Sequence, residues 1–244
     1  ICARYSADKK FSASISFTRE KVVSVTYRAG ILEANCKTMY GDNGFKVCVR
    51  IKTDGKQTAD LTGITIEEAG YIELYTCIVT TFKHSDLVSA KEELLSHADK
   101  SYDEMKREHI ADFSAIMGRS SLELEDDAEL SELTATERLE RLKNEPEAHD
   151  YSLMALYWQF GKYLLVSSSR NGTLPANLQG VWADGLTPPW SSDYHTNINL
   201  QMNYWQAEEV NLGECTSALF DYMNNYLLPG GKKVARENYE SRGM

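Results

Sequence analysis

The spacing of hydrophobic residues changes near residue 83, and this change constrains the fold more than any other feature of the chain. Before it, apolar and polar residues alternate with a period of two. The alternating apolar positions are Phe11, Ala13, Ile15 and Phe17 in one run and Phe45, Val47, Val49 and Ile51 in another. Asn43-Gly44 and Asp54-Gly55 supply hairpin-turn chemistry between such runs. Residues 1–83 are therefore predicted to be antiparallel β-structure.

After residue 83 the apolar residues recur at helical spacing. Ser101 followed by Glu104 is a capping-box pattern, and Gly118 is a typical C-terminal stop, so residues 87–117 are predicted to form one or two helices. A second helix is expected over 151–168. Further helical stretches are expected over 200–209 and 215–227, before a break at Pro229-Gly230-Gly231.

Residues 172–199 have neither period and are predicted to form a long loop. Pro175, Pro188 and Pro189 interrupt regular backbone hydrogen bonding in this segment. Compact domains seldom carry such a long loop without a functional reason. The segment is therefore the first place to look for a site.

The net charge of −10 disfavours nucleic acid and anionic membrane surfaces as partners, because both are negatively charged. No apolar run reaches the roughly 18 residues of a membrane-spanning helix, and no signal-peptide pattern opens the chain. The five cysteines are odd in number and lack CxxC spacing, so buried free thiols are expected. A neutral substrate fits this composition best.

The predicted loop and the residues after it are rich in amides and tryptophan. The amide side chains are those of Asn171, Asn177, Gln179, Asn197, Asn199, Gln201 and Asn203. Three of the four tryptophans, Trp182, Trp190 and Trp205, lie in the same stretch. Amides match the donors and acceptors of sugar hydroxyls, and indole faces cover the apolar faces of a pyranose ring. This combination is typical of a sugar-binding pocket.

The same stretch contains the motifs PANLQGVW, PPW and YHTNINLQMNYW, followed by Glu208, Asn211, Leu212, Glu214 and Cys215. With these motifs the chain resembles glycoside hydrolase family 95, the inverting α-L-fucosidases. The resemblance implies an N-terminal β-sandwich domain ending within residues 1–83, a helical linker over 84–120, and an (α/α)6 catalytic barrel beginning at 121–244. Too few helices follow residue 151 to complete such a barrel, so we expect only the N-terminal portion of a larger enzyme.

The resemblance also implies roles for individual residues. Asn197 and Asn199 of the HxNxN element are expected to position the attacking water from one side of an extended segment, and His195 to contact the sugar. The alternative for both asparagines is turn formation or helix capping. Trp182 and Trp190 are candidate stacking platforms, or else core residues.

An inverting glycosidase needs a general acid and a general base, and the family places both beyond residue 244 of this chain. The nearby carboxylates, which have ordinary structural explanations, are Asp184, Asp193, Glu208, Glu209 and Glu214. No zinc-ligand spacing is present, and no metal or cofactor is expected. The chain alone is therefore expected to be inactive.

The expected substrate is a fucosylated oligosaccharide or glycan, and the remainder of the enzyme is a further expected partner. The family implies a periplasmic or extracellular location. Two alternatives remain at this point: a non-catalytic carbohydrate-binding module, and a related (α/α)6 glycosidase such as an α-L-galactosidase. Phosphorylases are disfavoured, because the motif offers no basic phosphate site.

Overall fold

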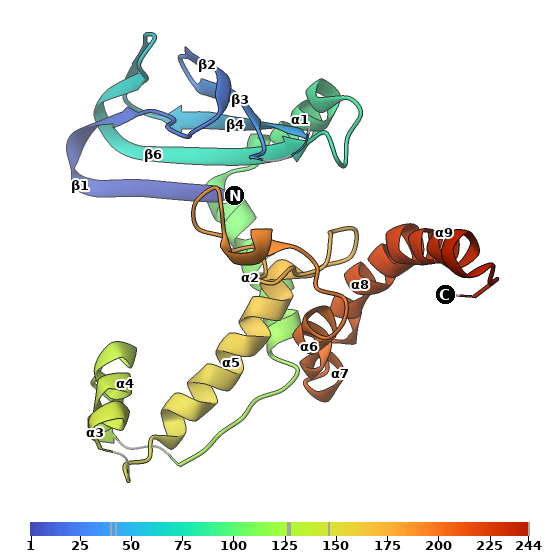
Figure 1. Ribbon diagram of the computed structural model, residues 1–244. Coiled ribbons are helices and arrows are strands. Elements are labelled where there is room, and N and C mark those ends of the chain that lie inside the picture. Colours follow the sequence, from blue (N-terminus) through green and yellow to red (C-terminus); the bar gives the residue numbers. More distant parts are fainter. Residues whose placement is uncertain (40, 42, 126–127, 146, 244) are drawn as a thin grey trace. The chain divides into compact units, whose positions relative to one another are not determined.

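The computed structural model describes residues 1–39, 41, 43–125, 128–145 and 147–243 (Figure 1). The chain divides into two compact units, Ile1–Ala111 and Asp112–Met244. The first unit holds the β-sheet and the second most of the helices. The assignment of domains to 1–83, 84–120 and 121–244 stays a prediction.

The strands of the first unit form one antiparallel sheet. They are β1 (Cys2–Ile15), β2 (Val22–Arg28), β3 (Ile31–Lys37), β4 (Gly44–Thr53), β5 (Lys56–Ala59) and β6 (Ile64–Thr80). Their order is β1-β6-β4-β3-β2, and β5 pairs with β6 beside this path. The prediction of antiparallel strands is confirmed. In the part of the chain that the structure describes they make a single sheet, so the second layer of a β-sandwich stays a prediction.

The alternating residues face a hydrophobic core, as their period of two requires. The buried members of this core are Leu32, Ala34, Cys36, Val47, Val49, Ile51, Ile64, Ile66, Ala69 and Ile72, with Phe11, Ala13, Ile15 and Phe17 packed against them. The cysteines are free thiols, and Cys36, Cys48 and Cys215 are buried as expected, whereas Cys2 and Cys77 are half-buried.

The helical spacing after residue 83 produces α1 (Leu87–Ser96), a 3-10 turn (His97–Asp99) and α2 (Tyr102–Met117), as predicted. Asp86 caps α1 by accepting hydrogen bonds from two backbone N–H groups of the first turn. The Ser101 hydroxyl likewise accepts from the N–H of Glu104 at 3.2 Å, which confirms half of the expected capping box.

The second unit is helical. Its α-helices are α3 (Ala128–Ser131), α4 (Ala135–Asn144), α5 (Tyr151–Ser168), α6 (Asn199–Tyr204), α7 (Gln206–Glu209), α8 (Ser217–Tyr222) and α9 (Leu228–Tyr239). Short 3-10 turns lie at Pro189–Ser192 and Gly213–Thr216. The core joins the end of α2 to α5 and to the helices after residue 199. Its buried residues are Ile116, Leu165, Val166, Leu200, Tyr204, Ala207, Val210, Leu212 and Cys215. Within the described part of this unit the structure shows no closed barrel, so the (α/α)6 architecture stays a prediction.

Two buried charged groups tie α5 to its neighbours. The Arg138 guanidinium of α4 donates to both carboxylate oxygens of Asp150, which in turn caps the first turn of α5. The fully buried Lys162 ammonium donates to the backbone carbonyls of Met117 and Ser120, at the end of α2. Burial lowers the pKa of Lys162. Carbonyls at a helix C-terminus attract a cation, which explains a lysine at this buried position.

The predicted break at Pro229-Gly230-Gly231 is wrong. The chain continues from α8 through a π-helical turn, Met223–Leu227, into α9, which carries Pro229 in its first turn. Proline is tolerated there because its missing N–H and its ring interfere only with the preceding turn, which is wide in the π form.

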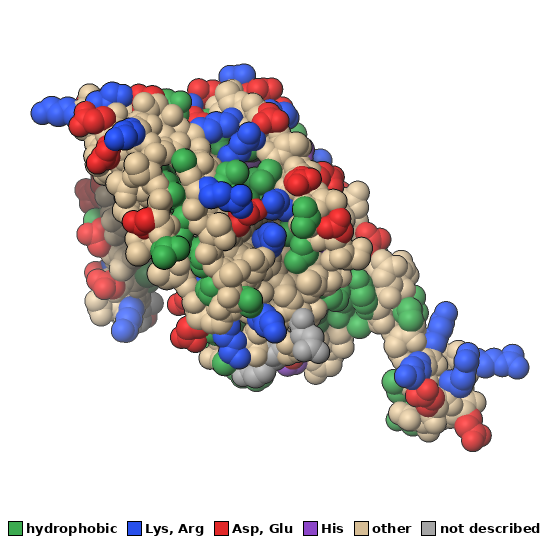
Figure 2. All heavy atoms as spheres, turned by 90° about the horizontal axis from the view of Figure 1, so that it is seen from above, with side chains coloured by type: hydrophobic (Ala, Val, Ile, Leu, Met, Phe, Trp, Pro, Cys, Tyr) green, Lys and Arg blue, Asp and Glu red, His purple; other side chains and the backbone are tan. Residues whose placement is uncertain are grey.

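The surface mixes both signs of charge. Figure 2 shows acidic and basic side chains interspersed across the face in view, with hydrophobic side chains exposed between them. Most of the ion pairs involve partly or largely exposed groups, for example Lys10 with Asp54 and Arg28 with Glu33. Such exposed pairs contribute little to stability.

Candidate active site

The predicted loop is confirmed. Helix α5 ends at Ser168, and α6 begins at Asn199, one residue before the predicted start. The residues between them, 169–198 and called the motif loop below, contain only one 3-10 turn and an isolated bridge between Asn177 and Gly180. Pro188 has an extended backbone, with φ −64° and ψ 156°, so no helix runs through it.

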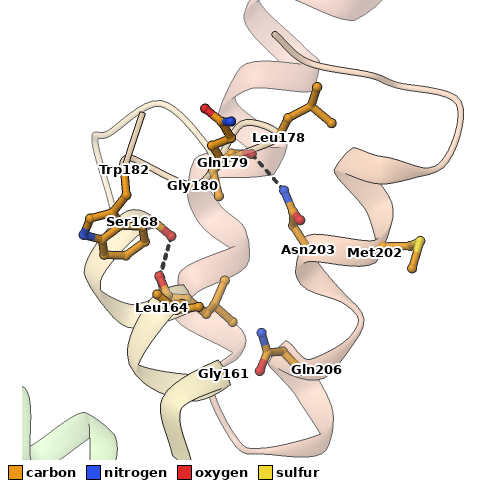
Figure 3. Close-up of a pocket in the computed structure, with 12 residues that line it drawn as sticks. Gly161, Leu164, Ser168, Leu178, Gln179, Gly180, Trp182, Met202, Asn203 and Gln206 are labelled. Carbon is orange, nitrogen blue, oxygen red and sulfur yellow. Dashed lines mark hydrogen bonds between the residues drawn. The ribbon is translucent and has the colours of Figure 1, made fainter. Parts of the chain in front are cut away.

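The motif loop is anchored at its start by residues of α6. The Tyr204 hydroxyl accepts a hydrogen bond from the N–H of Ala176 at 3.0 Å. The amide of Asn203 donates to the carbonyls of Ala176 and Asn177 at 3.3 and 3.0 Å. Figure 3 shows the Asn203 side chain pointing from α6 toward the loop. The YHTNINLQMNYW motif therefore supplies the anchors of the loop as well as its candidate site residues.

Three further amides are also engaged within the protein. The Asn177 side chain accepts from the N–H of Gln179 at 2.8 Å, and Gln179 accepts from the Ser192 hydroxyl at 2.6 Å. The Gln201 amide donates to the carbonyl of Thr196 at 2.7 Å. Asn177 thus satisfies a backbone N–H of the loop and Gln179 a side-chain hydroxyl, since constrained polar groups of a loop need such partners.

Asn197 and Asn199 differ from these amides. Both are exposed, and among the described residues neither side chain makes a hydrogen bond. The expectation that they lie on an extended segment is wrong: 196–198 form a turn, and Asn199 is the first residue of α6. Asparagine favours turns and helix starts, and that preference decides the local backbone. Their side chains remain available to a ligand.

His195 is half-buried beside Asp193. Its Nδ1 lies 2.9 Å from the Asp193 Oδ1, within ion-pair distance if the ring is protonated. The Nδ1 is nevertheless buried without a well-aligned hydrogen bond in the described residues. A small rotation of the ring or of the carboxylate would align the two groups at this distance.

His195, Asn199 and Trp190 meet at one hollow of about 450 Å³. Leu178, Gln179 and Pro189 complete its lining. The structure therefore brings together three of the five predicted site residues. Asn197 lies in the turn just before α6 but is not part of this lining, and neither is Trp182.

Trp182 lines a second hollow of about 420 Å³, which shares Leu178 and Gln179 with the first (Figure 3). The side chain is 46% exposed. Its ring lies against Gly180, where an added Cβ would come within 2.8 Å of the indole carbons. Its centroid is 6.2 Å from that of Tyr163 on α5. One side of the Trp182 ring is therefore packed against the protein, as expected for a core residue, while nearly half of the side chain stays exposed.

Trp190 is 76% exposed, and its backbone is strained. Trp190, Ser191 and Ser192 all have positive φ, at 48°, 57° and 50°, and none of them is glycine. The left-handed region costs an L-residue roughly 1–2 kcal/mol. Of the three only Trp190 lines the hollow, and a strained run that begins at a lining residue is the kind of strain that clusters at functional sites.

Two of the carboxylates near the motif loop have surroundings that the structure describes. Glu214 pairs with Arg119 at 2.5 Å, and this partner lowers its pKa, whereas a general acid needs a raised one. Glu208 packs against Gly213. Within the described residues, no group of three or more His, Cys, Asp or Glu side chains is arranged to hold a metal ion. The same residues include no helix long and apolar enough to cross a membrane.

Comparison with protein families identifies the family of the segment that contains this loop. Residues 101–244, more than half of the chain, match the model of the glycosyl hydrolase family 95 catalytic domain. The chain belongs to glycoside hydrolase family 95. The matched range contains the whole motif loop, both hollows and all five predicted site residues.

The relatives that the chain matches are fucosidases by name. The chain is 42% identical to Alpha-L-fucosidase 2 of Arabidopsis thaliana over 144 residues, which are 59% of this chain and 17% of that protein. It is 39% identical to Probable alpha-fucosidase A of Aspergillus oryzae over 169 residues, 67% of this chain and 23% of the relative. The chain thus spans about a fifth of the length of these relatives.

Leu178 and Pro189 line the hollow but were not predicted for the site, whereas Gln179 is one of the amides that the sequence indicated. Leu178 lies inside the motif PANLQGVW and Pro189 inside PPW, which is a signal that they belong near the site. The contact between Gln179 and Ser192 has no such signal, because the two residues lie 13 positions apart in a loop without periodicity.

Proposed function

We propose that this chain is part of an α-L-fucosidase that removes terminal α-L-fucose from glycans with inversion of configuration. The observation that carries the proposal is the meeting of Asn199, His195 and Trp190 at one hollow, inside the segment matched to the family 95 catalytic domain. The names of the relatives support fucose as the sugar.

In this proposal Asn197 and Asn199 position the attacking water. A neutral amide both donates and accepts hydrogen bonds and does not titrate, so it can orient water without competing for its proton. The absence of other partners for both amides among the described residues supports this role. His195 contacts the sugar, and Trp190 and Trp182 offer apolar faces to the glycan.

The general acid and the general base are proposed to come from residues beyond 244. Inverting hydrolysis requires two carboxyl groups roughly 6.5 to 9.5 Å apart, with water between the base and the sugar. Pairing with Arg119 lowers the pKa of Glu214, which argues against Glu214 as the acid. The remaining part of the enzyme is thus a required partner of this chain, and a periplasmic or extracellular location is proposed with it.

The match to a catalytic-domain model argues against a non-catalytic carbohydrate-binding module. An α-L-galactosidase differs in substrate by a single hydroxyl group, and the described residues offer no feature that favours it. Fucose is therefore retained as the proposed sugar.

The test is hydrolysis by the full-length protein that contains residues 1–244. A chromogenic α-L-fucoside should be cleaved faster than the matching α-L-galactoside. Proton NMR of the first product should show β-L-fucose, as inversion requires. Faster cleavage of the galactoside would change the substrate, initial release of α-L-fucose would reject inversion, and no cleavage of either would reject the proposed function.

A further inference from the structure

The position of the Trp190 indole depends on a strained backbone. Positive φ values at Trp190, Ser191 and Ser192 place three non-glycine residues in the left-handed region. Such a run persists only where the surrounding structure holds it. Trp190 itself supplies little packing, since it is 76% exposed and stacks on no other aromatic ring in the described part of the chain. Something other than the indole must therefore hold the run in place.

Polar contacts to Leu178 and Gln179 hold the C-terminal end of the strained run. The Ser192 hydroxyl donates to Oε1 of Gln179 at 2.6 Å. Beside it, the N–H of Leu178 donates to the carbonyl of Asp193 at 3.3 Å. These two hydrogen bonds join the two ends of the segment 180–191, which carries both candidate tryptophans. The hydroxyl–amide bond is the shorter, and it ends on the last residue of the strained run.

Gln179 both takes part in this junction and faces the space that a ligand would occupy. Its side chain lines the hollow of Trp190, His195 and Asn199, and also the hollow beside Trp182. In Figure 3 it extends from the turn that precedes Gly180, away from Gln206. A change in its hydrogen bond to Ser192 would therefore move one wall of the hollow relative to another.

We propose that Gln179 and Ser192 are a positioning pair that holds the Trp190 indole at the wall of the hollow and so sets the affinity for the glycan. This inference rests on the proposed function, because it assigns the pair to the same site. Neither residue takes part in the chemical step. The pair should therefore control KM and leave kcat and its pH profile unchanged.

The experiment compares variants of the full-length protein on a chromogenic α-L-fucoside. Ser192→Ala and Gln179→Leu remove the hydrogen bond without adding bulk. Each should raise KM about 3- to 10-fold, the amount that one ordinary hydrogen bond supports, with kcat within about twofold of wild type. Gln179→Glu keeps an acceptor for the Ser192 hydroxyl, so it should retain most of the wild-type affinity.

Ser191→Ala is the matched control. Ser191 lies in the same strained run and is exposed, but its hydroxyl makes no hydrogen bond among the described residues. This variant should leave KM and kcat unchanged. An equal rise in KM for Ser191→Ala and Ser192→Ala would overturn the assignment to the Gln179–Ser192 bond.

A double-mutant cycle separates positioning of Trp190 from a general effect on folding. Trp190→Ala alone should raise KM, and Ser192→Ala should add nothing further in that background. An undiminished effect of Ser192→Ala without the indole would reject the proposal, as would a fall in kcat with KM unchanged. The wild-type protein must first cleave the fucoside, and its failure to do so would reject the proposed function instead.

Discussion

Among the described residues, the asparagines of the YHTNINLQMNYW motif differ in what their side chains do: Asn203 bonds within the protein, whereas Asn197 and Asn199 do not. Asn203, four residues after Asn199, donates hydrogen bonds to carbonyls of the motif loop and so anchors it. Asn197 and Asn199 are exposed and make no hydrogen bond to the described residues. An amide without internal partners gains nothing in stability from its position. Loss of these two amides should therefore affect function rather than folding.

We expect Asn197→Ala and Asn199→Ala in the full-length protein to lower turnover of an α-L-fucoside about 10²-fold, because a small misplacement of a reacting group costs this much. Their melting temperatures should stay close to wild type, as for other exposed substitutions. Asn171→Ala, which removes another exposed amide of the motif loop, is the control and should keep full turnover. Near-wild-type turnover in both variants would show that neither residue positions the water.

Two features of the site could not be predicted from the sequence: the backbone conformation at Asn199 and the hydrogen bond between Ser192 and Gln179. Asn199 was predicted on an extended segment but begins α6, because the turn and helix-start preferences of asparagine act locally and prevail. The bond between Ser192 and Gln179 was not predicted, since it depends on how a loop folds back on itself. The residue types of the site were readable from the sequence, whereas their mutual placement required the fold.

At the scale of elements, periodicity located the strands and helices because burial imposes it. Val47, Val49 and Ile51 alternate and are buried together, and α5 ends at the predicted Ser168. The predicted break at Pro229 failed for a different reason. Proline ends a helix only when it lies inside one, and a π-helical turn places Pro229 at the start of α9 instead. That turn has no signature in the spacing of apolar residues.

The junction of α4 and α5 yields a prediction about acid stability. The buried guanidinium of Arg138 holds the pKa of Asp150 at about 2, below its ordinary value of 3.8. A carboxylate with a depressed folded-state pKa stabilises the fold above its unfolded-state pKa, and this stability is lost as the pH falls toward the folded-state value. The pair should therefore contribute roughly 2 kcal/mol at pH 5 that disappears between about pH 4 and pH 2.

Urea unfolding of the wild type and of Asp150→Asn across that pH range measures this contribution. The variant leaves Arg138 buried without its anion, so it should be less stable by roughly 3–5 kcal/mol at neutral pH, and it should lose less stability on acidification. A matched control is Asp112→Asn, which breaks the more exposed pair with Arg170. Equal acid sensitivity in the wild type and in Asp150→Asn would show that other carboxylates govern acid unfolding.

At the scale of the whole molecule, the second unit leaves much apolar surface uncovered. Leu139 on α4 and Leu156, Tyr157 and Phe160 on α5 are each at least half exposed. They line a hollow of about 620 Å³ between the two helices that is almost entirely apolar. Single exposed apolar residues are ordinary, but a continuous apolar surface of this kind marks a region that other protein normally covers.

We therefore expect residues 1–244, produced alone, to show no turnover of α-L-fucosides and to self-associate. The chain corresponds to 17–23% of the length of its fucosidase relatives, and it offers water-positioning amides without an identifiable acid and base. Light scattering and a fucosidase assay, run beside the full-length protein, measure both properties. Leu139→Lys and Tyr157→Lys should reduce association by charging the apolar hollow without restoring activity. Turnover by the short chain comparable to that of the full-length protein would place the catalytic carboxylates within residues 1–244, and Asp193 with Glu208 or Glu209 would then be the pair to substitute first.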